Sequence, residues 1–301
     1  MTLQNYKQMM DRSKTIGASE IGAILGINPY MTPADVWMVK TLRKPEFAGN
    51  EATERGLILE PAIASWFAKQ SKYKIDASQV RQFASRYCSA TPDFTYEFDD
   101  PNKGKVFGLL ETKSTGMRIN DSENIPEYWF LQGVFQCAVV GNVTEFTIAY
   151  LCGGLNFGAE TYAYDAEFGK QLLEFADEWY EQYVIADVAP EPKTAEDVKK
   201  LYKQTTQGIE ASDTVKQVLD KMKDLKLEIA VKESQLQELK SAVMLTMRDA
   251  EAITVDGKPL CTWKFSKPAK KLNVDALKAE MPEVYEKYLK EIEPNRVFLL
   301  K

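Results

Sequence analysis

Two short segments of this chain place acidic side chains on predicted β-strands. Asp93 follows Pro92 within YCSATPDFTYEF, and Glu111-Thr112-Lys113 lies within VFGLLETKST. Both segments have the residue types of strands, and the turn-rich DDPNKGK joins them, so an antiparallel pair is predicted. Such a pair lets Asp93 and Glu111 share one divalent metal ion. A metal, two carboxylates and an ammonium group suit the hydrolysis of a phosphodiester.

The chain contains no histidine, which narrows the chemistry of the site. Ser-His and Cys-His catalysis, histidine zinc sites and nucleases with an imidazole base are excluded. Mg²⁺ or Mn²⁺ needs only oxygen ligands and can ionise a bound water or bridge the attacking and leaving oxygens. We expect Asp93 and Glu111 to hold the ion, with the Thr112 carbonyl as a further ligand. Lys113 shares a strand face with Glu111 and would point at the scissile phosphate or the attacking water.

An acidic pair on neighbouring strands has a simpler interpretation as solvated surface groups, and a single D…ExK pattern is common by chance. Here the apolar stretch Gly108-Leu109-Leu110 leads directly into Glu111. This setting disfavours a purely exposed placement. Lys113 alone could equally be an ordinary ion-pair lysine.

The composition limits the possible fold class and cellular compartment of the protein. Its 301 residues, 45% of them hydrophobic, suffice for one large α/β core and a smaller second region. The four cysteines form no C-x-x-C pair, which favours buried thiols in a reducing compartment. Neither a signal peptide nor an apolar run of membrane-spanning length is evident, so we expect a cytoplasmic protein without membrane contact.

The charge is unevenly distributed along the chain. Residues 1–190 carry 17 Lys and Arg against 25 Asp and Glu, whereas residues 191–301 carry 21 against 19. This argues against a broad basic surface for nucleic acid, whose affinity comes mainly from released counterions. A nuclease of this composition must rely on local cations, on metal or on topology.

Helices are expected around the strands. TPADVWMVKTL and LEPAIASWFAKQS space their apolar residues as helices do. Because Pro61 disturbs a helix interior, we expect Glu60 in a first turn or at a kink. PEYWFLQGVFQCAVVG predicts a helix that carries Gln132 and Gln136 one turn apart on one face. TEFTIAYLCGG and FGAETYAYD predict a further strand pair, and AEFGKQLLEFADEWYEQYV predicts a closing helix.

A linker at ADVAPEPKTAED divides the chain into expected domains 1–190 and 191–301. Beyond it, apolar residues from Val215 to Val243 follow alternating steps of three and four, which predicts a coiled-coil-like helix. Lys232 interrupts this seam. The helix would pair in trans or fold back on the first domain, and the short seam with its lysine slightly favours folding back. AITVDGKPLCTWKF then predicts a hairpin, and NVDALKAEMPEVYEKYLKEI predicts two helices broken at Pro282.

Five motifs occur in one order within about residues 11–185: RSKTIGASEIGAILG, RGLILEP, SATPD, LLETK and the glutamine-bearing helix. This series resembles the YqaJ-type viral recombinase nucleases, relatives of phage lambda exonuclease in the PD-(D/E)xK superfamily. The resemblance implies an α/β (α+β) fold with a restriction-endonuclease-like core. That core is a central mixed sheet flanked by helices, to which a mainly helical C-terminal region is added. The added region resembles the tails of phage-encoded members and is absent from lambda exonuclease.

The resemblance also implies roles for single residues of the core. Asp93, Glu111 and Lys113 match the catalytic core, and Glu60 matches the helix-borne acid that completes the metal site. The family then implies a two-metal site for Mg²⁺ or Mn²⁺. The ligands would be Glu60, Asp93, Glu111 and Thr112.

Other matched residues concern the substrate and the helix beside the strands. Arg12 and Ser19 match residues that receive a 5′ phosphate, for which a guanidinium group and a hydroxyl group are suited. Either Gln132 or Gln136 matches an active-site glutamine. The sequence leaves open which of the two it is.

The family digests one strand of linear double-stranded DNA from its 5′ end and leaves a 3′ single strand for a phage-type annealing protein. The implied partners are therefore DNA ends and a single-strand annealing protein, in a bacterial or phage-infected host cell. Lambda exonuclease is a ring-shaped trimer, so a homo-oligomer is expected by analogy. A ring that encloses DNA would offset the negative charge of residues 1–190.

Two other functions remain open from the sequence alone. An endonuclease or junction-resolving nuclease would use the same core and would cut closed circular DNA as fast as linear DNA. A non-catalytic adaptor would keep the acidic residues without binding metal and recruit a partner through its C-terminal helix.

Overall fold

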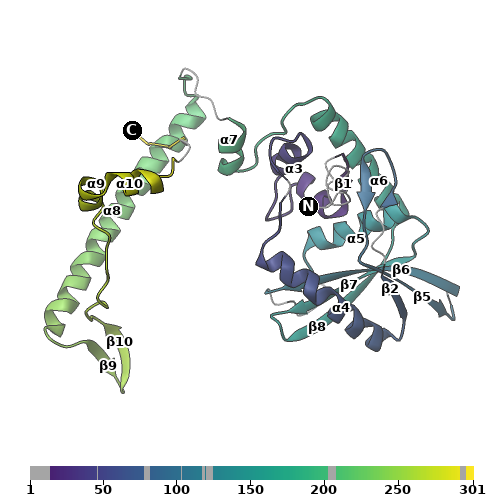
Figure 1. Ribbon diagram of the computed structural model, residues 1–301, viewed down its shortest axis with the longest axis horizontal. Coiled ribbons are helices and arrows are strands. Elements are labelled where there is room, and N and C mark those ends of the chain that lie inside the picture. The colour runs from purple at the N-terminus through teal and green to yellow at the C-terminus, as the bar shows by residue number, and fades with distance from the viewer. Residues whose placement is uncertain are drawn as a thin grey trace. The chain divides into compact units, whose positions relative to one another are not determined.

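The computed structural model of the chain describes residues 14–45, 47–77, 82–102, 104–116, 119, 125–202, 208–291 and 296–301. The chain forms two compact units, Met1–Tyr202 and Lys203–Lys301 (Figure 1). The first unit is a mixed sheet flanked by helices, and the second is mainly helical with one hairpin. The expected α/β architecture, a central mixed sheet flanked by helices with a mainly helical C-terminal region, is therefore confirmed.

A five-stranded sheet with strand order β2-β5-β6-β7-β8 forms the centre of the first unit. Its strands are β2 (Lys74–Ala77), β5 (Phe94–Asp100), β6 (Gly104–Thr115), β7 (Glu145–Cys152) and β8 (Asn156–Ala163). The pairs predicted from the sequence, β5 with β6 and β7 with β8, are both antiparallel neighbours. The prediction of one strand over YCSATPDFTYEF is wrong in part, because this segment forms β4 (Cys88–Ala90) in a second sheet and β5 in this one, with Asp93 between them. β6 and β7 run parallel, which makes the sheet mixed.

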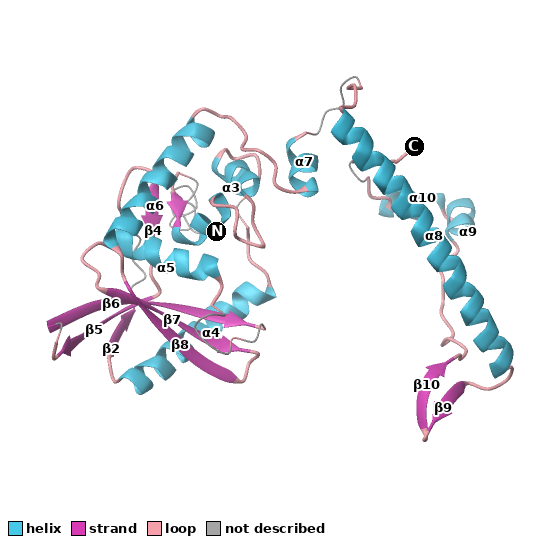
Figure 2. Cartoon of the chain, turned by 180° about the vertical axis from the view of Figure 1, so that it is seen from behind, coloured by secondary structure: helices cyan, strands magenta, loops and turns pink. Residues whose placement is uncertain are grey.

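Two helices cover the two faces of this sheet (Figure 2). α4 (Glu51–Ser71) packs Ile63 and Phe67 onto the face that carries Tyr96 and Leu110. α5 (Glu127–Val140) packs onto the other face, which carries Leu109 and Phe146. Because strand side chains alternate between faces, Glu111 and Lys113 share the α5 face with Leu109.

Pro61 lies in the middle of α4, so of the two positions expected for Glu60, a first turn or a kink, the first turn is wrong. The helix begins at Glu51 and continues past the proline to Ser71. An interior proline costs roughly 3 kcal/mol. The burial of Ile63 and its neighbours against the sheet stabilises α4 and offsets this cost.

A smaller layer lies beside the main sheet. It contains a sheet of β1 (Ile16–Gly17), β4 (Cys88–Ala90) and β3 (Gln82–Phe83). Its helical elements are η1 (Ala18–Glu20), α2 (Ile21–Ile24), α3 (Pro33–Lys40), α6 (Ala166–Trp179) and the π-helix η3 (Tyr180–Ile185). β1 and β4 run parallel, so the segment that leads into η1 lies beside the strand that leads to Asp93.

The predicted linker, residues 186–197, runs into a short helix, α7 (Ala195–Leu201), that is bonded to α3. The buried carboxylate of Asp197 accepts a hydrogen bond of 2.7 Å from the Thr32 hydroxyl group. Lys200 donates to Asp35 at 2.9 Å. These contacts place α7 in the first compact unit, and the predicted domain boundary at residue 190 stays a prediction.

The second unit contains one long helix and smaller elements. These are α8 (Asp213–Met247), the hairpin β9 (Ala252–Val255) and β10 (Lys258–Thr262), and the helices α9 (Val274–Glu280) and α10 (Pro282–Tyr288). The long helix, the hairpin and the break at Pro282 were all predicted from the sequence. Within the residues that the structure describes, no helix combines the length and apolar character needed to cross a membrane.

Candidate active site

Asp93 directly precedes β5, at the position that the strand register sets opposite Glu111. The antiparallel register pairs Phe94 with Leu110. Asp93, one residue before Phe94, therefore lies opposite Glu111, one residue after Leu110. Asp93 Oδ2 accepts hydrogen bonds from the backbone N–H of Thr112 at 2.9 Å and from its hydroxyl group at 3.0 Å. Burial raises the pKa of Asp93 to about 7, and the negative charge of Glu111 adds to this effect.

Glu111 is the centre of a hydrogen-bonded group on the α5 face of β6. Its side chain is 5% exposed, and both carboxylate oxygens accept hydrogen bonds. Oε1 accepts from Lys113 at 2.7 Å and from Gln132 at 2.6 Å, while Oε2 accepts from Gln136 at 2.7 Å. The structure therefore brings both predicted glutamines to the same carboxylate.

Lys113 is held between Glu111 and the side-chain oxygen of Gln132, to which it donates at 2.9 Å. Burial alone would lower the pKa of Lys113, but the charge and the hydrogen bond of Glu111 outweigh it and raise the pKa. The amine is consequently a cation at neutral pH. It can stabilise negative charge and donate hydrogen bonds, but it cannot act as a general base.

Glu60 reaches the same site from α4. Burial raises the pKa of its carboxyl group, and the charge of Glu111 raises it further, while Lys113 acts in the opposite direction. Glu60 also contributes to the raised pKa of Asp93. The three carboxylates thus lie within electrostatic reach of one another, and their mutual repulsion favours a cation among them.

The described residues nevertheless contain no group of three or more Cys, Asp and Glu side chains placed to hold one metal ion. In the arrangement seen here, the carboxylate of Glu111 binds Lys113 and two amides, and one oxygen of Asp93 binds Thr112. The use of the Thr112 carbonyl as a ligand remains a prediction. The convergence of charge is observed, but a complete coordination shell is not.

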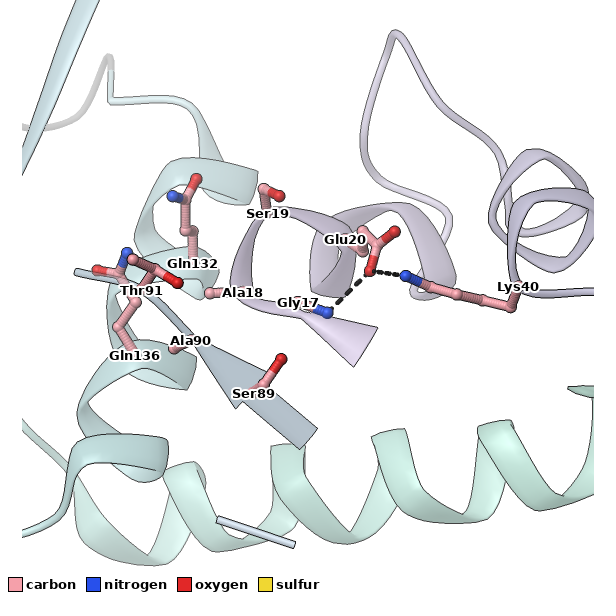
Figure 3. Close-up of a pocket in the computed structure, with 10 residues that line it drawn as sticks. All are labelled: Gly17, Ala18, Ser19, Glu20, Lys40, Ser89, Ala90, Thr91, Gln132 and Gln136. Carbon is pink, nitrogen blue, oxygen red and sulfur yellow. Dashed lines mark hydrogen bonds and ion pairs between the residues drawn. The ribbon is translucent and has the colours of Figure 1, made fainter. Parts of the chain in front are cut away.

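A pocket of about 150 Å³ lies next to this group (Figure 3). Its lining includes Ser19 from η1, Thr91 before β5, and the two glutamines of α5. Ser19 is exposed to solvent and lies on the same side of the pocket as Gln132. Arg12, the second residue expected to receive a 5′ phosphate, lies outside the described residues.

An ion pair in the same pocket was not predicted from the sequence. Lys40 binds Glu20 at 2.6 Å, and its side chain is only 2% exposed. The same Glu20 oxygen accepts the backbone N–H of Gly17 at 2.8 Å. This pair fixes the turn that presents Ser19. The only signal in the sequence was that Glu20 directly follows Ser19, which is too weak to identify such a pair.

Gly133 lets α5 approach the sheet closely enough for its glutamines to reach Glu111. A Cβ at this position would lie 2.3 Å from the ring of Phe146, which is itself fully buried. We therefore expect Gly133→Ala to lower the free energy of unfolding by about 1–3 kcal/mol, measured by denaturant titration. Gly56→Ala is the matched control, because apart from the local backbone of α4 nothing lies within 4 Å of a Cβ at this position. It should stabilise the protein slightly, and equal destabilisation by both changes would contradict this account.

Comparison with known proteins identifies similar sequences. Residues 7–145 match the family described as the YqaJ-like viral recombinase domain. The uncharacterized protein YqaJ of Bacillus subtilis (strain 168) is 26% identical over 298 residues, which cover 94% of this chain and 90% of that protein. The matched family segment includes all the site residues described above.

Among solved structures, two exonucleases resemble part of this chain at low identity. The alkaline exonuclease LHK-Exo of Laribacter hongkongensis is 13% identical, with a TM-score of 0.46, and the match covers 60% of this chain and 93% of that one. A phage related exonuclease of Haemophilus somnus 129PT is 12% identical, with a TM-score of 0.42, and the match covers 57% and 96%.

Proposed function

We propose that this chain, which carries a YqaJ-like viral recombinase domain as its motifs predicted, is a metal-dependent exonuclease that digests linear double-stranded DNA from the 5′ end. The family supports a nuclease role. The observation that carries the proposal is the group that Asp93, Glu111 and Lys113 form with two glutamines of α5, at the central strand β6. Carboxylates that can hold a metal ion, and a lysine ammonium group beside them, suit phosphodiester hydrolysis without histidine.

The donor set fits a hard divalent cation. Glu60, Asp93 and Glu111 offer only carboxylate oxygens, and within the described residues the second oxygen of Asp93 has no hydrogen-bond donor. These three residues would hold Mg²⁺ or Mn²⁺, and a two-ion site is part of the proposal. Such ions lower the pKa of bound water and stabilise charge on the attacking and leaving oxygens.

The protein's own groups then have separate tasks. The ammonium group of Lys113 lies beside Glu111, where it can donate a hydrogen bond to a phosphate oxygen and stabilise its developing charge. Gln132 orients this ammonium through its side-chain oxygen and binds Glu111 through its amide nitrogen. Gln136 fixes the other oxygen of the same carboxylate. Both glutamines are therefore positioning residues in this proposal.

The polarity of digestion is proposed to come from the adjacent pocket. Ser19 lines the same small pocket as the two glutamines, so a phosphate held there would lie next to the hydrolytic group. The pocket's one described cation, Lys40, is already bound by Glu20. Arg12 would supply the charge that balances a 5′ phosphate.

The biological setting follows from this activity. Digestion from the 5′ end leaves 3′ single-stranded tails, which a phage-type single-strand annealing protein would use in homologous recombination. The excess of acidic residues in 1–190 is easier to reconcile with a ring-shaped homo-oligomer that encloses DNA than with an open cleft. The ring trimer is therefore retained as part of the proposal.

The test is digestion of end-labelled duplex DNA in Mg²⁺ or Mn²⁺, with linear and closed circular substrates compared. We expect release of 5′-terminal nucleotides from linear DNA alone, faster from a 5′-phosphate than from a 5′-hydroxyl end. Ser19→Ala should reduce the preference for the phosphate about tenfold, the effect of one lost charge-assisted hydrogen bond. Lys113→Ala should abolish digestion.

Other outcomes point to other functions. Equal cutting of circular and linear DNA would identify an endonuclease, and a preference for the 5′ phosphate unchanged in Ser19→Ala would remove the pocket from the mechanism. A folded protein that binds no metal in calorimetry and digests nothing would be a non-catalytic adaptor. Ser85→Ala is a suitable control, because Ser85 is part-buried and bonds Asp177 away from the pocket.

A further inference from the structure

Helix α8 carries a row of apolar side chains that remain exposed. The row repeats at alternating steps of three and four residues, the spacing of the a and d positions of a coiled coil. Its exposed apolar members keep 41–67% of their surface accessible and are Val215, Val218, Leu225, Ile229, Leu236, Leu239 and Val243. Met222 and Lys232 occupy the two other positions, and we call the whole row the seam.

The rest of the second unit that the structure describes leaves the seam uncovered. The hairpin reaches only the end of α8, where Cys261 lies 4.0 Å from the buried Met247. A long helix in water owes most of its stability to packing of its apolar face. The described residues of the second unit therefore give this 35-residue helix no partner along its apolar seam.

The charges beside the seam disfavour one arrangement of two such helices. In a parallel pair, equivalent seam positions face each other, so Lys232 would meet Lys232 of the second copy. The flanking positions, e and g of a coiled coil, lie beside the seam on the helix surface. In a parallel pair they would set Lys221 against Lys226 of the second copy, and Glu228 against Glu233 of the second copy. All three contacts join like charges, which destabilise helix pairs.

An antiparallel pair removes these conflicts in one register. When Ile229 faces Lys232 of the second copy, every seam position from 218 to 243 meets another seam position. The flanking position of Lys226 then meets Glu233 of the second copy, twice by symmetry. Lys232 lies beside Glu228 of the second copy, so its charge can leave the seam while its methylene groups pack.

Neighbouring antiparallel registers are worse. A shift of one heptad in one direction sets Lys226 against Lys226 and Glu228 against Glu228. A shift in the other direction sets Lys226 against Lys240 and Glu233 against Glu233. Both shifts also shorten the overlap of the seam. The flanking charges thus select one orientation and one register.

We propose that α8 is a dimerisation helix, which pairs antiparallel with α8 of a second copy of this chain in the register that joins Ile229 to Lys232. The occupant of the seam is then the same sequence in the opposite direction. This pairing is separate from any assembly of the first unit and does not depend on the nuclease activity.

Cysteine cross-linking of the full chain tests the pairing directly. In the proposed register Val218 faces Val243 of the second copy, whereas within one helix these positions are about 38 Å apart. A Val218→Cys, Val243→Cys double variant, in a Cys261→Ser background, should form covalent dimers on mild oxidation. Either single variant alone should form none, while a mixture of the two should cross-link.

Charge reversal tests the pairing independently, with the dissociation constant of the dimer measured by sedimentation equilibrium. Lys226→Glu should weaken the pairing of copies about 4- to 30-fold, because two attractive contacts become repulsive. Adding Glu233→Lys should restore it. Lys223→Glu is the charge-matched control, since position 223 lies outside the seam and its flanks, and it should change little.

Several results would overturn the proposal. A cross-link formed by Val218→Cys alone, or tighter pairing in Lys226→Glu, would show a parallel pair, because Lys221 would then gain an attractive partner. Absence of any cross-link in a folded double variant would show that the seam is covered by the α9–α10 segment of its own chain, or by a different protein.

Discussion

Replacing Glu111 by glutamine should lower the rate of DNA digestion by at least about 1000-fold. The change removes a proposed metal ligand and the counter-charge of Lys113 while keeping the size of the side chain. Loss of one preorganised electrostatic group costs about 10²–10³ in turnover, and here a ligand is lost as well. The rate is measured as nucleotide release from labelled linear duplex under single-turnover conditions.

Stability separates this catalytic role from a structural one. An amide in place of Glu111 cannot accept all three present hydrogen bonds, so a lower free energy of unfolding is also expected. Glu145→Gln is the matched control, because Glu145 is also a buried carboxylate of the sheet, but it accepts from Tyr96 on the α4 face. It should lose stability and keep its activity. Equal loss of activity in both variants would mean that Glu111 acts only through the fold.

The strand pair that carries the site could be predicted from the sequence because the signals were local. β5 and β6 could be predicted from alternating apolar residues on both sides of a turn of Asp, Pro, Asn and Gly. The two-residue period of a strand then predicts that Glu111 and Lys113 share one face. The choice between Gln132 and Gln136 could not be made in this way. Residues four apart lie on one helix face, and the depth at which α5 packs decides how many of them reach the strand.

Tertiary packing explains the features that the sequence did not predict. A proline signals the start or end of a helix, yet α4 continues across Pro61 because its apolar face is buried. Lys40 is the last residue of α3 and would be expected at the surface, but Glu20, the last residue of η1, lies against it and its amine is buried. Such pairs depend on contacts between distant segments, which no short pattern contains.

Replacing Asp93 by asparagine should stabilise the metal-free protein while it abolishes digestion. The pKa of Asp93 is raised to about 7, so the folded protein binds its proton more tightly than the unfolded chain does. Stability of the wild type therefore falls as the pH rises from about 4 to about 7. Asparagine cannot ionise, and its side-chain oxygen can still accept from Thr112. At pH 8 in chelator, we expect the variant to be more stable by about 2 kcal/mol, which allows for the coupling of Asp93 to its neighbours.

Thermal unfolding at several pH values, with and without Mn²⁺, measures this effect. The two proteins should converge near pH 4, where Asp93 is protonated in the wild type. Mn²⁺ should raise the melting temperature of the wild type, because the bound ion neutralises carboxylates that repel each other. The melting temperature of the variant should change little, because it lacks the carboxylate of Asp93. Asp99→Asn, at an exposed position of β5, should resemble the wild type in every condition. A variant less stable than the wild type at pH 8 would show that Asp93 is not destabilised by its neighbours, and would remove the electrostatic basis of the metal site.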